Sequence, residues 1–178
     1  MTLLIVDRDE STLLGGATAE FSPCRTYRYA LTRRWAATGP VATFVMLNPS
    51  TADAFTVDPT VRRCLGFARA WGCAGLTVLN AFALRSTDPK ALTGHPDPVG
   101  PDNDATIRRY LIVTDGGPVI AAWGADRAVR AHQRDTVLCA LVREFTGGVL
   151  QCLGTTAAGA PRHPLYMRGD VRPRAWSE

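Results

Sequence analysis

Short, largely apolar runs alternate along the chain with segments of helical periodicity. The four runs cover residues 41–47, 76–80, 119–123 and 148–153. Runs of this length without regular polar positions are typical of strands that are covered on both faces in a parallel sheet. Strands that alternate with helices predict an α/β fold. We therefore expect a three-layer sandwich with a mostly parallel four-stranded central sheet and helices on both faces.

The clearest helix is predicted just after the first run. Asp58 can cap it and Pro59 fits its first turn, and an apolar stripe follows at helical spacing: Val61, Cys64, Leu65, Ala68 and Trp71. Further helices are expected over 104–113 and within 125–145. Residues 85–102 read as a long polar loop with four prolines.

The N-terminal residues 1–40 read as a lead-in to this fold. Within them, residues 27–35 alternate with period two, which predicts one extra, half-exposed strand. The length of 178 residues suits a single α/β domain that spans residues 1–178.

Composition narrows the class of protein. No apolar run is long enough to span a bilayer, and the opening residues lack the pattern of a secretory signal, so we expect a cytoplasmic protein with no membrane partner. The five cysteines include no CxxC pair, so no metal site and no cofactor are expected. The net charge of +4, carried almost wholly by arginine, is compatible with DNA or a nucleotide as partner. A GC-rich genome would give the same arginine bias.

Polar motifs follow the four runs. In parallel sheets, ligands bind outside the carboxyl ends of the strands. The motifs here are Asn48-Pro49-Ser50, Asn80-Ala81-Phe82, Trp123-Gly124 and, beyond the fourth run, His163-Pro164. The chain contains no GxGxxG, P-loop or GxSxG motif, so dinucleotide, nucleoside-triphosphatase and serine-hydrolase functions lose their usual support.

These motifs resemble a bacterial family of unknown function, domain of unknown function 1643. The resemblance rests on the stretch 45–53, on Asn80-Ala81-Phe82 and on His163-Pro164-Leu165. It covers nearly the whole chain and implies no activity.

The order of the motifs also resembles, more distantly, the uracil-DNA glycosylase superfamily. That family has a first strand that ends near a conserved Pro, a second that ends in Leu-Asn, a third that ends in Trp-Gly, and a final His-Pro-Ser loop. This chain departs from it at Met46, where the family usually has glycine, and at Leu165, where it has serine.

This second resemblance implies cleavage of an N-glycosidic bond. Such a reaction needs a placed water and stabilisation of the charge on the leaving base. By this resemblance Asn48 positions the water, Asn80 reads the base and His163 stabilises the leaving base. The residues alone leave simpler roles open: Asn48 and Asn80 can form turns with their own backbone, and His163 can be a surface residue.

Further residues are candidates for binding the substrate. The small Ser50 leaves room for a larger or modified base. Phe55 or Phe82 can stack on a base, although an aromatic beside a strand end is more often part of the core. The other candidates are Pro49, Trp123 and Gly124 around the pocket, and Arg85 and Arg162 near a phosphate.

Three functions remain open from the sequence. The first is an N-glycosidase, a hydrolase that acts on a base in DNA or in a nucleotide. The second is a non-catalytic module that binds a nucleotide or nucleic acid. The third is a different hydrolase or transferase with the same strand-end geometry. A carboxylate at position 48 would have favoured catalysis, whereas an amide is a poor general base.

Overall fold

A computed structural model describes residues 4–9, 16–50, 52–88 and 90–177. Its strands form one sheet in the order β1-β2-β3-β5-β4-β6-β7-β8. They are β1 (Ile5–Asp9), β2 (Ala17–Phe21), β3 (Arg28–Arg34), β4 (Val41–Met46), β5 (Gly75–Asn80), β6 (Val119–Ala121), β7 (Gln151–Cys152) and β8 (Arg174–Ala175).

The helices lie mainly between the later strands. They are α1 (Pro59–Ala70), α2 (Ala91–Gly94), α3 (Asn103–Ile112), α4 (Arg127–Ala131), α5 (Arg134–Thr146) and the 3₁₀ helix η1 (Pro164–Tyr166). Asp58 caps α1, since its Oδ1 accepts from the Val61 N–H at 2.7 Å, as predicted. Among the described residues, no helix is both long and apolar enough to cross a membrane.

The centre of the sheet is parallel. β4 pairs in parallel with β5 on one side and with β6 on the other, and β6 pairs in parallel with β7. These are the four predicted runs, although β6 and β7 end sooner than expected. Every residue of β4 and β5 is buried, which explains why both strands read as continuous apolar runs.

The prediction of a four-stranded, mostly parallel sheet is wrong in its extent. The eight-stranded sheet is mostly antiparallel, because β1, β2 and β3 add to the edge at β5 and β8 adds to β7. Residues 5–34 therefore contain three strands where the lead-in was expected to hold one. β1, β2 and β8 were missed because two five-residue strands and a two-residue strand carry too little periodicity to be recognised.

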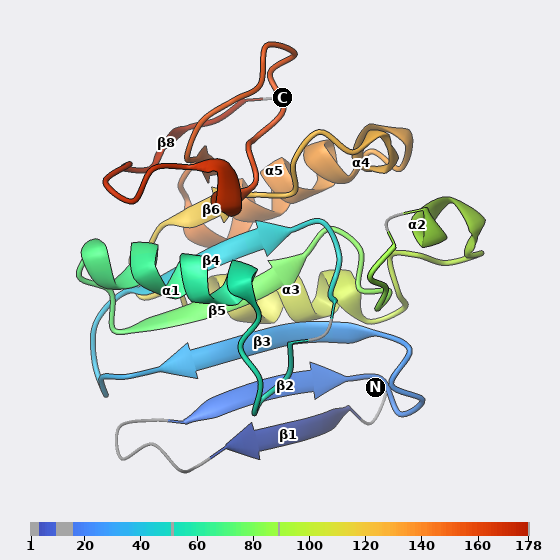
Figure 1. Ribbon diagram of the computed structural model, residues 1–178, viewed down its shortest axis with the longest axis horizontal. Helices are drawn as coiled ribbons and strands as arrows, with labels where there is room; N and C mark the ends of the chain where they lie inside the picture. The colour runs from blue at the N-terminus through green and yellow to red at the C-terminus, as the bar shows by residue number, and fades with distance from the viewer. Residues whose placement is uncertain (1–3, 10–15, 51, 89, 178) are drawn as a thin grey trace.

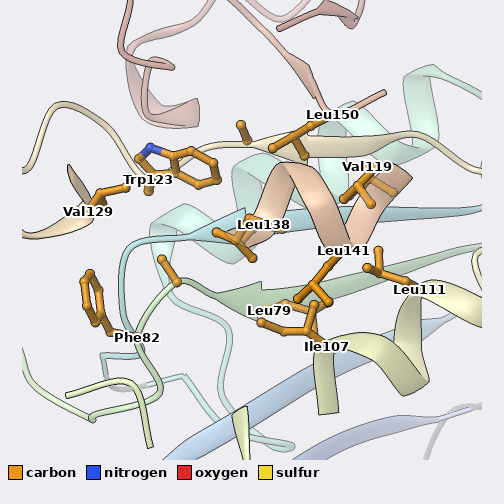
Figure 2. Close-up of a cluster of buried hydrophobic side chains, with 14 of the residues drawn as sticks. Leu79, Phe82, Ile107, Leu111, Val119, Trp123, Val129, Leu138, Leu141 and Leu150 are labelled. Atoms are coloured by element: carbon orange, nitrogen blue, oxygen red, sulfur yellow. The ribbon is translucent and has the colours of Figure 1, made fainter. Parts of the chain in front are cut away.

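Helices cover both faces of the parallel centre, as Figure 1 shows. α1 packs through Val61, Cys64 and Phe67 on one face. α3 and α5 pack on the other face, where Ile107, Leu138 and Leu141 surround Leu79 (Figure 2). Successive residues of a strand point to opposite faces, so Val78 and Asn80 lie on the α1 face while Leu79 lies on the α3–α5 face.

Candidate functional site

A pocket of about 260 Å³ lies at the carboxyl ends of the parallel strands, below the start of α1. We call it the strand-end pocket. Residues from β3, β4, β5 and α1, and from the loops beyond β4, β5, β6 and β7, line it: Arg28, Met46, Leu47, Asn48, Ser50, Asp58, Thr60, Val61, Val78, Asn80, Ser86, Thr87, Trp123 and His163. The pocket thus brings together side chains from all four predicted motifs: Asn48 and Ser50, Asn80, Trp123, and His163.

Asn80 is the last residue of β5 and is fully buried. Neither its side-chain oxygen nor its side-chain nitrogen has a hydrogen-bond partner among the residues that the structure describes. A buried amide without partners costs about 1–3 kcal/mol of folding free energy. Because Asn80 lines the strand-end pocket, its donor and its acceptor are both free to meet a ligand there.

The backbone after β5 is held from the opposite face of the sheet. Asn103, at the start of α3, donates from Nδ2 to the carbonyl oxygens of Asn80 (3.1 Å) and Ala81 (3.4 Å). Arg134 of α5 donates from Nε to the Ala81 oxygen at 2.8 Å, and it forms an ion pair with Asp104 at 2.5 Å. These contacts fix the position from which the Asn80 side chain enters the pocket.

We expect Asn80→Leu to raise the free energy of unfolding of the ligand-free protein by about 1 kcal/mol, because it removes an unpartnered buried amide at similar volume. The matched control is Asn103→Leu, which should lower it by about 1–3 kcal/mol because Asn103 donates to two carbonyls. Urea denaturation of the three proteins measures both values. A loss of stability in Asn80→Leu equal to that of the control would show that the Asn80 amide is a structural group.

Asn48 follows β4 and is oriented by the backbone around it. Its Nδ2 donates to the carbonyl oxygens of Ser86 (2.9 Å), Pro49 (3.3 Å) and Leu84 (3.4 Å). Carbonyl oxygens only accept hydrogen bonds, so this contact set determines which end of the amide faces them. The Oδ1 atom is left to accept a hydrogen bond from a molecule in the pocket. Asn48 therefore has the turn-forming role left open by the sequence and lines the pocket as well.

His163 precedes η1 and is brought to the pocket by the loop that follows β7. Its Nδ1 accepts from the Leu165 N–H at 3.4 Å. Burial lowers the pKa of His163 below its ordinary 6.5, and the field of Asp58 opposes that shift. The ring is therefore neutral at pH 7, with its proton on Nε2, and it can donate one hydrogen bond from that atom.

Asp58 and Ser50 add a carboxylate and a hydroxyl to the pocket. Ser50 Oγ donates to Asp58 Oδ2 at 3.2 Å, while Oδ1 caps α1. The capping role was predicted from the sequence, but the position of the carboxylate in the pocket was not. The only signal available was that Asp58 follows the first motif by a few residues.

Arg28 is the residue of the pocket that local sequence patterns indicate least. It begins β3 and is only 3% exposed, although arginines in an alternating strand are usually solvated. Its Nη1 donates to the carbonyl oxygen of Ala52, and its Nε has no partner among the described residues. Burial lowers the pKa of Arg28 to about 10, against the weaker opposing field of Asp58.

Three of the candidates, Phe82, Phe55 and Arg85, do not line the strand-end pocket. Phe82 is buried among the residues under α3 and α5 (Figure 2), where it packs edge-on against His132, so it belongs to the core. Phe55 is 65% exposed and lines a separate cavity. Arg85 lies over the Phe21 ring and donates to the Arg25 carbonyl oxygen.

The remaining candidates occupy the surroundings of the pocket. Arg162 is exposed and donates to the Thr155 carbonyl oxygen at 3.1 Å. Pro49 is buried, and its carbonyl oxygen accepts from Asn48 and from the Ser86 N–H. Gly124 lines a neighbouring cavity of about 280 Å³ that shares Trp123 with the strand-end pocket. Trp123 thus lines both of these cavities, whereas Gly124 lines the neighbouring one and not the strand-end pocket.

The geometry defines a mixed α/β protein with a polar pocket at the carboxyl ends of its parallel strands. Within the part of the chain that the structure describes, no three His, Cys, Asp or Glu side chains are grouped so that they could hold a metal ion. The family model described as "Protein of unknown function (DUF1643)" matches residues 28–165, and the chain belongs to this family. Comparison with curated proteins and with solved structures gives no match.

Proposed function

We propose that the protein hydrolyses the N-glycosidic bond of a nucleobase, either in DNA or in a nucleotide. The observation that carries this proposal is the buried Asn80 amide, whose unpartnered donor and acceptor line the same pocket as His163 and Asn48. A carboxamide presents the donor–acceptor pair that a base edge requires. The order of motifs shared with the uracil-DNA glycosylase superfamily supports the same function.

In the proposed reaction, water attacks the anomeric carbon while the bond to the base breaks. The bonding electron pair leaves on the base nitrogen, and a proton from the water is finally taken up by the base. Asn48 Oδ1 accepts a hydrogen bond from the attacking water and orients it. His163 donates from Nε2 to the departing base, whose negative charge grows in the transition state.

The proposed site assists the removal of a proton from the attacking water less than it assists the other steps. Asn48 cannot act as a base at neutral pH. Asp58 is the carboxylate that lines the pocket, and both of its oxygens already accept hydrogen bonds from the chain. We therefore propose slow turnover, with most of the rate enhancement coming from positioning and from the stabilised leaving group.

The contacts of Asn48 favour a second candidate, a non-catalytic module that binds a nucleotide or nucleic acid in the strand-end pocket. Asn48 has its amide nitrogen engaged by three backbone carbonyls, as a purely structural residue would. This alternative keeps Asn80 as the group that recognises the ligand and removes the chemical roles of Asn48 and His163.

A base-release assay separates the two candidates. Oligonucleotides that carry uracil, hypoxanthine or alkylated bases are incubated with the protein and treated with alkali, which cuts the chain at abasic sites. Free nucleosides and nucleotides are tested in parallel by chromatography of the released base. We expect release from at least one substrate in single-turnover conditions. Binding without release from any substrate would refute hydrolysis and leave the binding module.

A further inference from the structure

Two arginines of the described chain are buried to the same extent, Arg28 and Arg134, each 3% exposed. Arg134 lies away from the strand-end pocket and forms an ion pair with Asp104 at 2.5 Å. Arg28 lines the pocket, and among the described residues no carboxylate lies within ion-pair distance of it. The fold therefore supplies a counter-charge for one buried guanidinium and leaves the other without one.

A buried cation without a paired anion is costly, and proteins rarely keep one without a partner. The contacts of Arg28 within the chain are few. Nη1 donates to the Ala52 carbonyl oxygen, and Nε lacks a partner among the described residues. Asp58, the carboxylate that lines the pocket, is already hydrogen-bonded by the Val61 N–H and by Ser50 Oγ. Among the described residues the guanidinium thus has at least one donor, Nε, without an acceptor, and Arg28 lines the pocket in which a ligand could supply one.

We propose that Arg28 binds a phosphate monoester of the ligand, so that the strand-end pocket selects a nucleotide over the corresponding nucleoside. A guanidinium offers several N–H donors in one plane, which match the oxygens of a phosphate. His163 and Asn80 line the same pocket and each has a donor to offer an anion, while the Asp58 carboxylate is engaged by Ser50 Oγ and the Val61 N–H. A volume of about 260 Å³ suits a single small ligand.

This inference rests on the proposed function only in taking the strand-end pocket as the ligand site, and it does not require that any bond be cleaved. Neither the motifs of the sequence nor the family to which the chain belongs assigns a role to Arg28. The assignment narrows the ligand from a base in DNA or in a nucleotide to a free nucleotide with a terminal phosphate.

The test measures binding to the full chain of the common nucleoside 5′-monophosphates, the matching nucleosides and inorganic phosphate, by calorimetry and by thermal shift. We expect at least one monophosphate to bind at least tenfold more tightly than its nucleoside. Arg28→Met should abolish that preference, a loss of about tenfold to a hundredfold in affinity for the monophosphate. Arg28→Lys, which keeps the charge and removes the planar donor set, should keep part of it.

The matched control is Arg33→Met. Arg33 lies on the same strand and also donates to backbone carbonyls of the loop after β4, those of Asp53 and Thr56, but it does not line the strand-end pocket. The Arg33→Met protein should lose these hydrogen bonds to the loop and keep the full preference for the monophosphate over the nucleoside.

Equal affinities for nucleotide and nucleoside in the wild type, or a preference that survives Arg28→Met, would overturn the assignment. Base release that is absent while the Arg28-dependent preference is present would refute the proposed hydrolysis and leave the phosphate site. Base release from nucleoside monophosphates that is unchanged in Arg28→Met would refute the phosphate site alone.

Discussion

Replacing His163 with alanine is expected to slow base release about a hundredfold in single-turnover assays, with little change in ligand affinity. In the proposed reaction, the Nε2–H of His163 meets negative charge that is present in the transition state and largely absent from the bound substrate. Asn48→Ala should slow the reaction to a similar extent, since it removes the acceptor that orients the water. The two variants can be compared by quench-flow or manual quench on the substrate that the wild type cleaves best.

The chain provides a close control for this prediction in His95. The ring Nδ1 of His95 accepts from the Asp97 N–H at 3.2 Å, two residues on, as that of His163 accepts from the Leu165 N–H, and a proline follows each histidine. His95 does not line the strand-end pocket. His95→Ala should therefore leave the rate within about twofold of the wild type. Equal rate losses in both histidine variants would mean that the effect is a local loss of turn structure.

Asn48→Asp is expected to destabilise the protein by about 3 kcal/mol at pH 7. The carboxylate would place an acceptor against the three carbonyl oxygens that now accept from Nδ2, so three contacts become repulsive and a charge loses its solvation. From the sequence alone, a carboxylate at this position promised better water activation. The contacts of the amide nitrogen reverse that expectation for stability.

The sign of the pH dependence follows from the same contacts. The surroundings favour the protonated form of the introduced carboxyl group, so its pKa in the folded state lies above the value of about 3.9 in the unfolded state. The loss of stability is then complete above the folded pKa and shrinks as the pH falls through it. Urea denaturation at pH 7 and at pH 4.5 measures the difference between variant and wild type.

Gln133→Glu is the control for this amide-to-carboxylate change. Gln133 is exposed and its side chain makes no capping hydrogen bond to the helix that follows, so the free energy of unfolding should change by less than about 0.5 kcal/mol. An Asn48→Asp protein that is as stable as the wild type and releases base faster would show that the carbonyl contacts are dispensable.

The central part of the fold could be predicted because its signals are local. β4 and β5 are continuous apolar runs, and Asp58 with Pro59 marks the start of α1. The edge strands could not be predicted in the same way. The pairing of β3 with β5 joins segments more than forty residues apart, and no local pattern specifies an antiparallel neighbour.

The residues of the candidate site likewise divide into those that local patterns predict and those that depend on long-range pairing. Asn48, Asn80 and His163 could be named because each follows a strand or its loop directly, and strand ends meet at one edge of a parallel sheet. Arg28 could not be named, since its burial depends on β3 lying beside β5 and on the loop that carries Ala52. Phe82 was left open between stacking on a base and packing in the core, because a strand-end position does not tell to which face the side chain turns; it lies in the core.

The hydrogen bonds that hold the end of β5 from the α3–α5 face of the sheet have a consequence for the affinity of binding. Asn103 and Arg134 fix the carbonyls of Asn80 and Ala81, so the recognising amide is already in place before a ligand arrives. The conformational entropy of ordering this segment is lost on folding and need not be lost again on association. When the binding-competent state is nearly the whole population, the apparent dissociation constant equals the intrinsic one. If Asn80 recognises a ligand as proposed, Asn103 and Arg134 on the far face of the sheet, which do not line the pocket, thereby help to set the fraction of molecules that are ready to bind.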